Sequence, residues 1–231
     1  MTAGPVIHAD FHQGSEEWLA ARCGLLTASE MKLILTPTLK PASNDKERSH
    51  LYELLAQRVT KYVEPRYVGD DMLRGQEDEI TAFDLYSEHF ARADRVGFIT
   101  NDRWGFTLGY SPDGVIGDDG TIECKSRRQK FQIETFATSV LDGTLPADFA
   151  IQVQTGLLVS ERAWCDLVSF SGGLPLAVIR AYPDEKIHEA ILTAAADFEE
   201  RLARKRLDYL HALTKSKLIP TERRSILEMH L

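Results

Sequence analysis

Residues 111–125 read SPDGVIGDDGTIECK, and the last four of them constrain the fold most. Successive side chains of a β-strand point to opposite faces, so Glu123 and Lys125 share one face while Ile122 and Cys124 share the other. One face of this strand is therefore ionic and the other is apolar. We expect such a strand to lie between a polar site and a hydrophobic core.

A tight turn is expected just before this strand. Residues 118–120 are Asp-Asp-Gly, and an Asp-Gly pair supplies the positive φ angles that a hairpin turn needs. Such a hairpin folds Asp113 back beside Glu123. The segment therefore predicts two neighbouring carboxylates with the ammonium group of Lys125 next to them.

Two adjacent carboxylates repel each other and favour a bound cation. Their hard oxygen atoms suit Mg²⁺ or Mn²⁺ better than zinc. A metal held in this way can bind a phosphate oxygen and lower the pKa of a water molecule, while Lys125 stabilises the developing charge. The pattern thus indicates hydrolysis of a phosphodiester. The alternative is that Asp113 and Glu123 are surface charges of a hairpin with Lys125 as their ion-pair partner.

The length and composition fit one globular domain. The chain has 231 residues, of which 43% are hydrophobic and 27% are charged, and we expect a single domain over residues 1–231. Its core is expected at about 14–182, and a helix with a tail at about 184–231. No apolar run approaches the roughly 18 residues of a membrane span. The expected location is the cytoplasm.

The cysteines and the net charge argue against several functional classes. Cys23, Cys124 and Cys165 are far apart and form no C-x-x-C pair, which favours reduced thiols over a zinc site or a four-cysteine iron–sulfur cluster. The formal net charge of −8 argues against a simple nucleic-acid-binding module, whose surface is normally basic. A metal-dependent nuclease tolerates this charge better, because its acidic residues hold the metal.

A candidate phosphate site precedes the hairpin in the chain. Ser15 is expected to cap a short helix that carries Arg22, and either Thr27 or Ser29 is expected to cap the next helix. The N–H groups at a helix start, a serine hydroxyl and an arginine together suit a phosphate group. The alternative is that Ser29 only caps the helix and that Arg22 forms a surface ion pair.

Two helices are predicted between this site and the hairpin. The first carries an apolar stripe that we expect in the core, formed by Leu51, Leu54, Leu55, Val59 and Tyr62. The second spans about residues 72–90.

Glu79 lies on the predicted inward face of the second helix, with Ala82, Phe83 and Tyr86, whereas Asp78 does not. A carboxylate among core residues is costly unless it has a partner, and a metal site is one such partner. The alternative is a slightly rotated helix with Glu79 at its boundary.

Further strands and helices are expected around the hairpin. Residues 96–100 and 104–110 alternate like antiparallel strands, and residues 164–170 and 176–182 are the remaining predicted strands. Residues 149–159 predict an inward helix. In that helix Gln152 needs a polar partner, and Gly156 permits a close approach to the sheet. A long amphipathic helix is expected at about 184–213.

Three cations follow the hairpin directly, at Arg127, Arg128 and Lys130. Such a run is usually the solvated start of a helix. Here it adjoins the expected metal site, so it could equally contact the phosphates beside the scissile bond.

Five motifs in this order resemble the lambda exonuclease family, also described as YqaJ-type viral recombinases, within the PD-(D/E)xK nuclease superfamily. They are Trp18 with RCGLLTASE at 22–30, GQEDEITA at 75–82, SPDG at 111–114, Glu123-Cys124-Lys125, and QVQ at 152–154. The resemblance covers about residues 14–182. Cys124 departs from the leucine of the family's best-known member, and the helix expected at 184–213 carries no motif that aligns.

The resemblance implies an α/β (α+β) fold with a restriction-endonuclease-like core, in which helices flank a central mixed β-sheet. It implies that Asp113, Glu123 and the backbone carbonyl of Cys124 bind Mg²⁺, with Mn²⁺ as a substitute and one or two ions in the site. Glu79 contributes to this metal site indirectly. The remaining catalytic residues that the resemblance implies are Lys125, Glu79 and Gln152.

The resemblance also implies a 5′ to 3′ exodeoxyribonuclease that digests one strand at a double-stranded DNA end. A 3′ single strand then remains for phage-type recombination by annealing. A ring-shaped homotrimer, a single-strand annealing protein as partner, and a phage or prophage gene in a bacterial host belong to this expectation. The family's residues for the 5′-phosphate fall on Arg22 and Ser29, and Thr27, Arg127 and Arg128 are expected to contact the DNA as well.

Two other functions stay open on the sequence alone. A RecB-like or restriction-like endonuclease on the same fold would also cut covalently closed circular DNA. A catalytically silent module that binds DNA ends is the non-enzymatic alternative. The intact set of Asp113, Glu123 and Lys125 argues against it.

Overall fold

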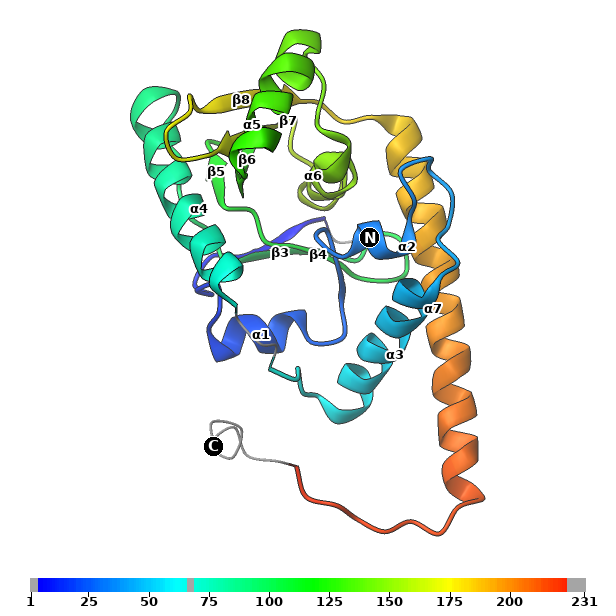
Figure 1. The fold of residues 1–231 in the computed structure, drawn as a ribbon. Helices are drawn as coiled ribbons and strands as arrows, with labels where there is room; N and C mark the ends of the chain where they lie inside the picture. Colours follow the sequence, from blue (N-terminus) through cyan, green and yellow to red (C-terminus); the bar gives the residue numbers. More distant parts are fainter. Residues whose placement is uncertain (1–3, 66–68, 224–231) are drawn as a thin grey trace.

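The computed structural model describes residues 4–65 and 69–223, and in this part of the chain helices flank two four-stranded mixed sheets (Figure 1). The expected α/β fold is confirmed, with two sheets where one central sheet was expected. The first sheet has the order β1-β3-β4-β2, formed by Val6–His8, Phe98–Asn101, Leu108–Tyr110 and Leu26–Thr27. The second has the order β5-β6-β7-β8, formed by Gly114–Ile116, Gly120–Ser126, Trp164–Phe170 and Ala177–Ala181. Residues 224–231 of the expected tail lie outside the described residues.

Each sheet contains one parallel pair. Strands β2 and β4 are parallel in the first sheet, and β6 and β7 are parallel in the second, while the other neighbours are antiparallel. Residues 111–113 connect β4 with β5 and so carry the chain from one sheet to the other. The predicted carboxylate pair therefore lies where the two sheets meet.

The predicted helices are confirmed in type and approximate position. The helices of the described residues are α1 Glu16–Arg22, α2 Met31–Ile34, α3 Asp45–Thr60, α4 Asp70–His89, α5 Gln129–Thr135, the π-helical segment η1 Phe136–Val140, α6 Ala147–Ser160 and α7 Glu185–Thr214. The Ser15 hydroxyl caps α1 by accepting the N–H of Trp18, at 3.2 Å. Asp184 caps α7 in the same way. A polar residue with an extended backbone starts both helices, as capping requires.

Two expectations about the helices are wrong. Neither Thr27 nor Ser29 caps α2, because Thr27 belongs to β2 and its hydroxyl donates instead to Glu30, at 2.7 Å. Val59 is 40% exposed and Tyr62 lies beyond the end of α3, so the predicted core stripe ends at Leu55, about two turns earlier than expected.

The predicted hairpin forms with β5 and β6 as its arms, in the register Gly114 opposite Ile122. The residue that allows the turn is different from the expected one. Gly117 has the positive φ angle, 50°, whereas Gly120 begins β6. A side chain at Gly120 would overlap the ring of Trp164, so this glycine is required by packing and not by the turn.

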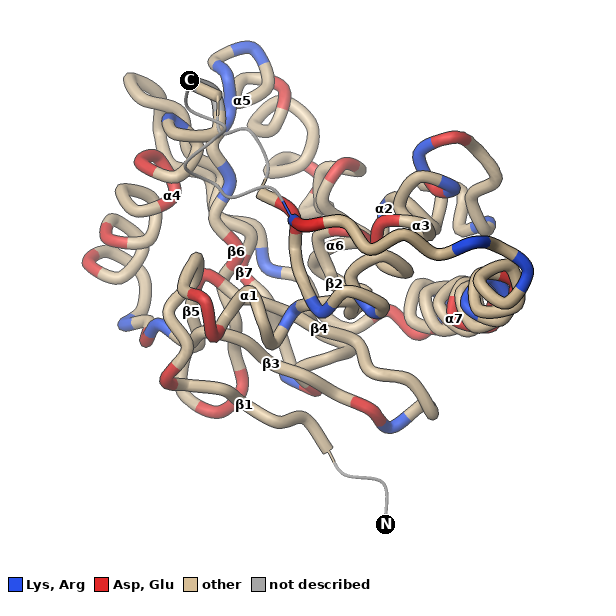
Figure 2. The backbone as a smooth tube through the Cα atoms, turned by 90° about the horizontal axis from the view of Figure 1, so that it is seen from below, with Lys and Arg blue, Asp and Glu red and all other residues tan. Residues whose placement is uncertain are grey.

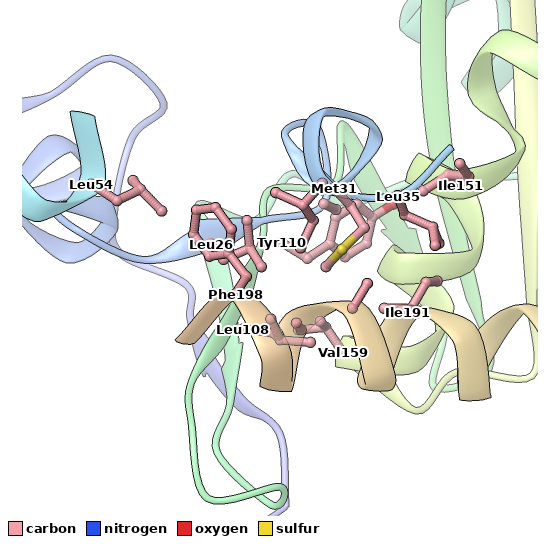
Figure 3. Packing of buried hydrophobic residues seen from close by; sticks show 14 of the residues in the cluster. Leu26, Met31, Leu35, Leu54, Leu108, Tyr110, Ile151, Val159, Ile191 and Phe198 are labelled. Carbon is pink, nitrogen blue, oxygen red and sulfur yellow. The ribbon is translucent and has the colours of Figure 1, made fainter. Parts of the chain in front are cut away.

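The largest group of buried apolar side chains lies between the first sheet and α2, α3, α6 and α7 (Figure 3). A second group joins α4 to the apolar face of β6 and β7, and it consists of Ala82, Phe83, Tyr86, Ile122, Cys124 and Val168. The predicted alternation in β6 is thereby confirmed. Its apolar residues are covered by α4, and its ionic residues point to the opposite face.

The long helix α7 packs against the core only along its first half. Its buried residues are Ile191, Ala194, Ala195, Phe198 and Leu202. Beyond Leu202 the helix extends past the rest of the molecule (Figure 1). Among the helices of the described residues, none combines the length and the apolar character that crossing a membrane would require.

Replacing Gly156 with alanine is expected to destabilise the fold. The added Cβ would lie 2.6 Å from Cζ of Tyr110, so α6 or the tyrosine must move, at a cost of about 1–3 kcal/mol. Gly75 in α4 is the matched control, because a Cβ there meets nothing within 4 Å. Gly75→Ala should instead stabilise the protein by roughly 0.5–1 kcal/mol. Urea unfolding measures both, and an equal change in the two variants would contradict the close contact.

Candidate active site

Strand β6 presents Glu123 and Lys125 side by side on one face. The Lys125 ammonium donates to Oε1 of Glu123 at 2.6 Å, and the Glu123 side chain is almost wholly buried. Burial alone would lower the pKa of Lys125, but the negative charges of Glu123 and Asp113 outweigh this effect and raise the pKa above its ordinary value. Lys125 therefore stays positively charged at neutral pH.

Asp113 lies beside this pair, as the hairpin predicts. Its Oδ2 accepts the backbone N–H of Cys124 at 2.6 Å. Withdrawal from water and repulsion by Glu123 raise the pKa of Asp113 to about 7, although attraction by Lys125 opposes the shift. The two carboxylates are close enough to repel each other, which is the arrangement expected of a cation site.

Both oxygens of Glu123 are held by further donors. The side-chain amide of Gln152, on α6, donates to Oε1, and the hydroxyl of Tyr110, on β4, donates to Oε2 at 3.1 Å. Burial and the charge of Glu123 raise the pKa of Tyr110, so its hydroxyl stays protonated and remains a donor. Gly156, one turn after Gln152, leaves room for the tyrosine ring. Gln152 thus has a polar partner, as the sequence requires, and this partner is the carboxylate of Glu123.

Helix α4 brings two acidic residues to the same region. Burial raises the pKa of Glu79, Lys125 lowers it, and Glu123 and Asp78 raise it further, which places Glu79 within the field of the site. Asp78 was expected to face away from the core. That expectation is wrong, because Asp78 accepts a hydrogen bond from the hydroxyl of Ser126, at the end of β6, at 2.6 Å.

The oxygen atoms at this site fit a hard divalent cation. Within the described ranges, no three His, Cys, Asp or Glu side chains are arranged to enclose a metal ion by themselves. The N–H of Cys124 points to Asp113 and not to β7, so the carbonyl of Cys124, which leaves the strand on the same side, faces that edge too. Two carboxylates and one carbonyl suit Mg²⁺, which keeps several of its water molecules.

The predicted phosphate residues form a second polar cluster around Arg22. Its guanidinium group donates to the hydroxyls of Ser111, at 3.1 Å, and Thr27, at 3.3 Å, and lies over the ring of Trp18. The hydroxyls of Thr27 and Ser29 are 3.3 Å apart. Ser111 is two residues from Asp113, so the cluster adjoins the carboxylate pair along the chain.

The two predicted DNA contacts after β6 have different environments. Arg128 precedes α5 and is exposed. The side chain of Arg127 is only 10% exposed and lies between the rings of Phe131 and Phe149. Sequence reasoning missed Tyr110 and Phe149. The aromatic position just before Ser111 was a signal for Tyr110, whereas nothing local indicates that Phe149 would reach β6.

The chain was compared with protein families and with known proteins. Residues 17–163 match the model of the YqaJ-like viral recombinase domain. No curated protein matches the chain. The alkaline exonuclease LHK-Exo from Laribacter hongkongensis is similar in structure, with 29% sequence identity, a TM-score of 0.74, and coverage of 87% of this chain and 99% of that one.

Two further solved structures are similar. LHK-Exo in complex with dAMP matches with 30% identity and a TM-score of 0.76, over 87% of this chain and 99% of that one. A phage-related exonuclease from Haemophilus somnus 129PT shares the fold, with 13% identity, a TM-score of 0.52, and coverage of 78% and 96%. Together with the family match, which spans more than half of the chain, these similarities show that the protein belongs to the YqaJ-like viral recombinase family.

Proposed function

We propose that this protein is a Mg²⁺-dependent 5′ to 3′ exodeoxyribonuclease. It would digest one strand of linear duplex DNA from the end and leave a 3′ single strand for phage-type recombination by annealing. The observation that carries this proposal is the meeting of Asp113, Glu123 and Lys125 at one edge of β6. A chain 29% identical to an alkaline exonuclease over 87% of its length supports it.

Each residue of the site has a role in this reaction. Asp113, Glu123 and the Cys124 carbonyl would hold Mg²⁺, which when bound withdraws charge from a phosphate oxygen and acidifies water. The positively charged Lys125 stabilises negative charge that develops on the reacting phosphate. Gln152 and Tyr110 keep the Glu123 carboxylate in place. Glu79 adds a partly buried carboxyl group at the same site.

The Arg22 cluster supports attack from the 5′ end. A guanidinium group with two hydroxyls, those of Thr27 and Ser29, is a suitable receptor for a terminal phosphate. The complex of LHK-Exo with dAMP supports a nucleotide as ligand of this family. Arg127 and Arg128 would contact phosphates farther along the DNA.

The remaining parts of the proposal concern the biological setting. We propose that the protein is a ring-shaped trimer that works with a single-strand annealing protein. Membership of a viral recombinase family supports a phage or prophage origin and action in the cytoplasm of a bacterial host. Sedimentation that finds only monomers would contradict the ring.

Incubation with linear duplex DNA, labelled at each strand end in turn, tests the reaction. With Mg²⁺ the label at a 5′ end should be released first, covalently closed circles should survive, and EDTA should stop the reaction. Lys125→Ala and Asp113→Asn should each lower the rate by about 10²–10³-fold, because charge stabilisation or metal binding is lost. Lys205→Ala is the control, since Lys205 forms its ion pair with Asp208 on the outer part of α7. Cutting of closed circles would favour the endonuclease alternative.

Arg22→Ala should slow digestion selectively on 5′-phosphorylated ends. Loss of a charge-assisted contact of about 1.5–3 kcal/mol corresponds to a slowing of roughly 10–150-fold. Ends with a 5′-hydroxyl should change much less. The control is Arg48→Ala, which removes an exposed arginine paired with Asp45. An equal loss on both kinds of end would exclude Arg22 as the phosphate receptor.

The affinity for Mg²⁺ should fall below neutral pH. The pKa of Asp113 is about 7 in the metal-free protein, and a carboxylate must be ionised to bind the metal, so affinity should drop by up to about tenfold per pH unit below that value. Titration calorimetry at several pH values measures this. A flat profile would show that Asp113 does not control binding.

The same raised pKa predicts the pH dependence of stability without metal. The folded protein binds the Asp113 proton more tightly than the unfolded chain, whose aspartate has the ordinary value of 3.8. The free energy of unfolding should therefore fall as pH rises from 3.8 towards 7, and added Mg²⁺ should restore it at high pH. Asp113→Asn should remove this part of the pH dependence.

A further inference from the structure

Cations and aromatic rings alternate along a path that begins at Lys125. Its Nζ lies 6.0 Å from the centre of the Phe149 ring. The guanidinium carbon of Arg127 lies 4.9 Å from that ring and 5.1 Å from the ring of Phe131. Nζ of Lys130 lies 4.6 Å from the Phe131 ring. We call these five residues the cation–aromatic ladder.

The strand geometry explains why the ladder starts at the candidate active site. Arg127 follows Lys125 by two residues, and its N–H donates to the carbonyl of Phe170 at 2.7 Å, which extends the pairing of β6 with β7 by one step. Residues two apart on an extended strand share a face, so Arg127 continues the row of Glu123 and Lys125. Helix α6 covers this row with Phe149, one turn before Gln152.

The ladder is mostly buried at its inner end and exposed at its outer end. The side chains of Lys125 and Arg127 are 16% and 10% exposed, Phe131 is 37% exposed, and Lys130 is exposed to solvent. Positively charged residues follow one another from β6 into the start of α5 (Figure 2). The ladder thus leads from the carboxylate pair to the surface.

The charge of Arg127 is poorly balanced by its surroundings. Its Nε is buried and has no hydrogen-bond partner in the part of the chain that the structure describes. An acidic group, Asp148, lies 3.8 Å from Nη1, but it is itself 78% exposed. A desolvated cation with an unused donor favours an anionic ligand. A phosphate group would supply the missing charge and the missing acceptor.

We propose that the cation–aromatic ladder binds single-stranded DNA next to the reacting phosphodiester. Phosphates and bases alternate along a single strand, as cations and rings alternate along the ladder, and stacking of bases on aromatic side chains is the usual means of binding such strands. Arg127 and Lys130 bind phosphates, and the exposed part of the Phe131 ring stacks on a base. This inference rests on the proposed nuclease function and adds that the strand is unpaired at α5.

Binding of a fluorescein-labelled oligothymidylate, measured by anisotropy in EDTA so that nothing is cleaved, tests the ladder. Phe131→Leu keeps an apolar side chain but removes the ring, and it should weaken binding by about tenfold, which corresponds to about 1.4 kcal/mol of lost stacking. Lys130→Gln should reduce the dependence of affinity on salt concentration. Tyr209→Leu is the matched control, because Tyr209 is an aromatic residue of similar exposure, 41%, on the outer part of α7.

A strand of the same length without bases separates stacking from a general loss of structure. Phe131→Leu and the parent protein should bind this abasic strand equally, and circular dichroism should show the same helix content for both. Unchanged binding of oligothymidylate by Phe131→Leu, or an equal loss in Tyr209→Leu, would overturn the ladder even if the parent digests linear duplex DNA. Failure of the parent to hydrolyse DNA while Phe131→Leu still loses affinity would instead refute the nuclease function alone.

Discussion

The geometry of the site depends on a carboxylate that is buried within the protein, Glu123. Glu123 is held by Lys125 from its own strand, by Gln152 from α6 and by Tyr110 from β4. A buried charge is costly unless hydrogen bonds replace the water it has lost. These three donors come from both sheets and from the helix between them. The site can therefore exist only when the two sheets are assembled.

The second carboxylate is held differently. Asp113 accepts a single backbone hydrogen bond, and its pKa rises to about 7, whereas the hydrogen bonds to Glu123 occupy both of its oxygens. Glu123 is therefore fixed by several donors of the protein, whereas Asp113 is held by fewer of them. This arrangement is compatible with the proposed metal site, to which Glu79 adds a further carboxyl group from α4.

Alternation along β6 made the central part of the site predictable, because side-chain direction in a strand follows from spacing alone. The sequence also indicated that Gln152 needs a polar partner, but it did not indicate that this partner is Glu123. Contacts between residues far apart in the sequence could not be predicted in this way. Tyr110 reaches Glu123 only because Gly156 lets the ring approach α6, and Asp78 meets Ser126 only because of how α4 crosses the sheet. The turn was assigned to Gly120 because Asp-Gly is a common turn pair. A glycine is needed at this position because any side chain would overlap the ring of Trp164.

The short connection between the sheets has a consequence for the size of the product. Arg22 bonds to Ser111, and only Pro112 separates Ser111 from Asp113. Two residues of backbone span at most about 7 Å. In the proposed reaction, the anchored end of a strand and the bond to be broken are therefore kept a fixed, small distance apart by covalent structure. In the proposed reaction, this short covalent spacing favours the release of one nucleotide at a time.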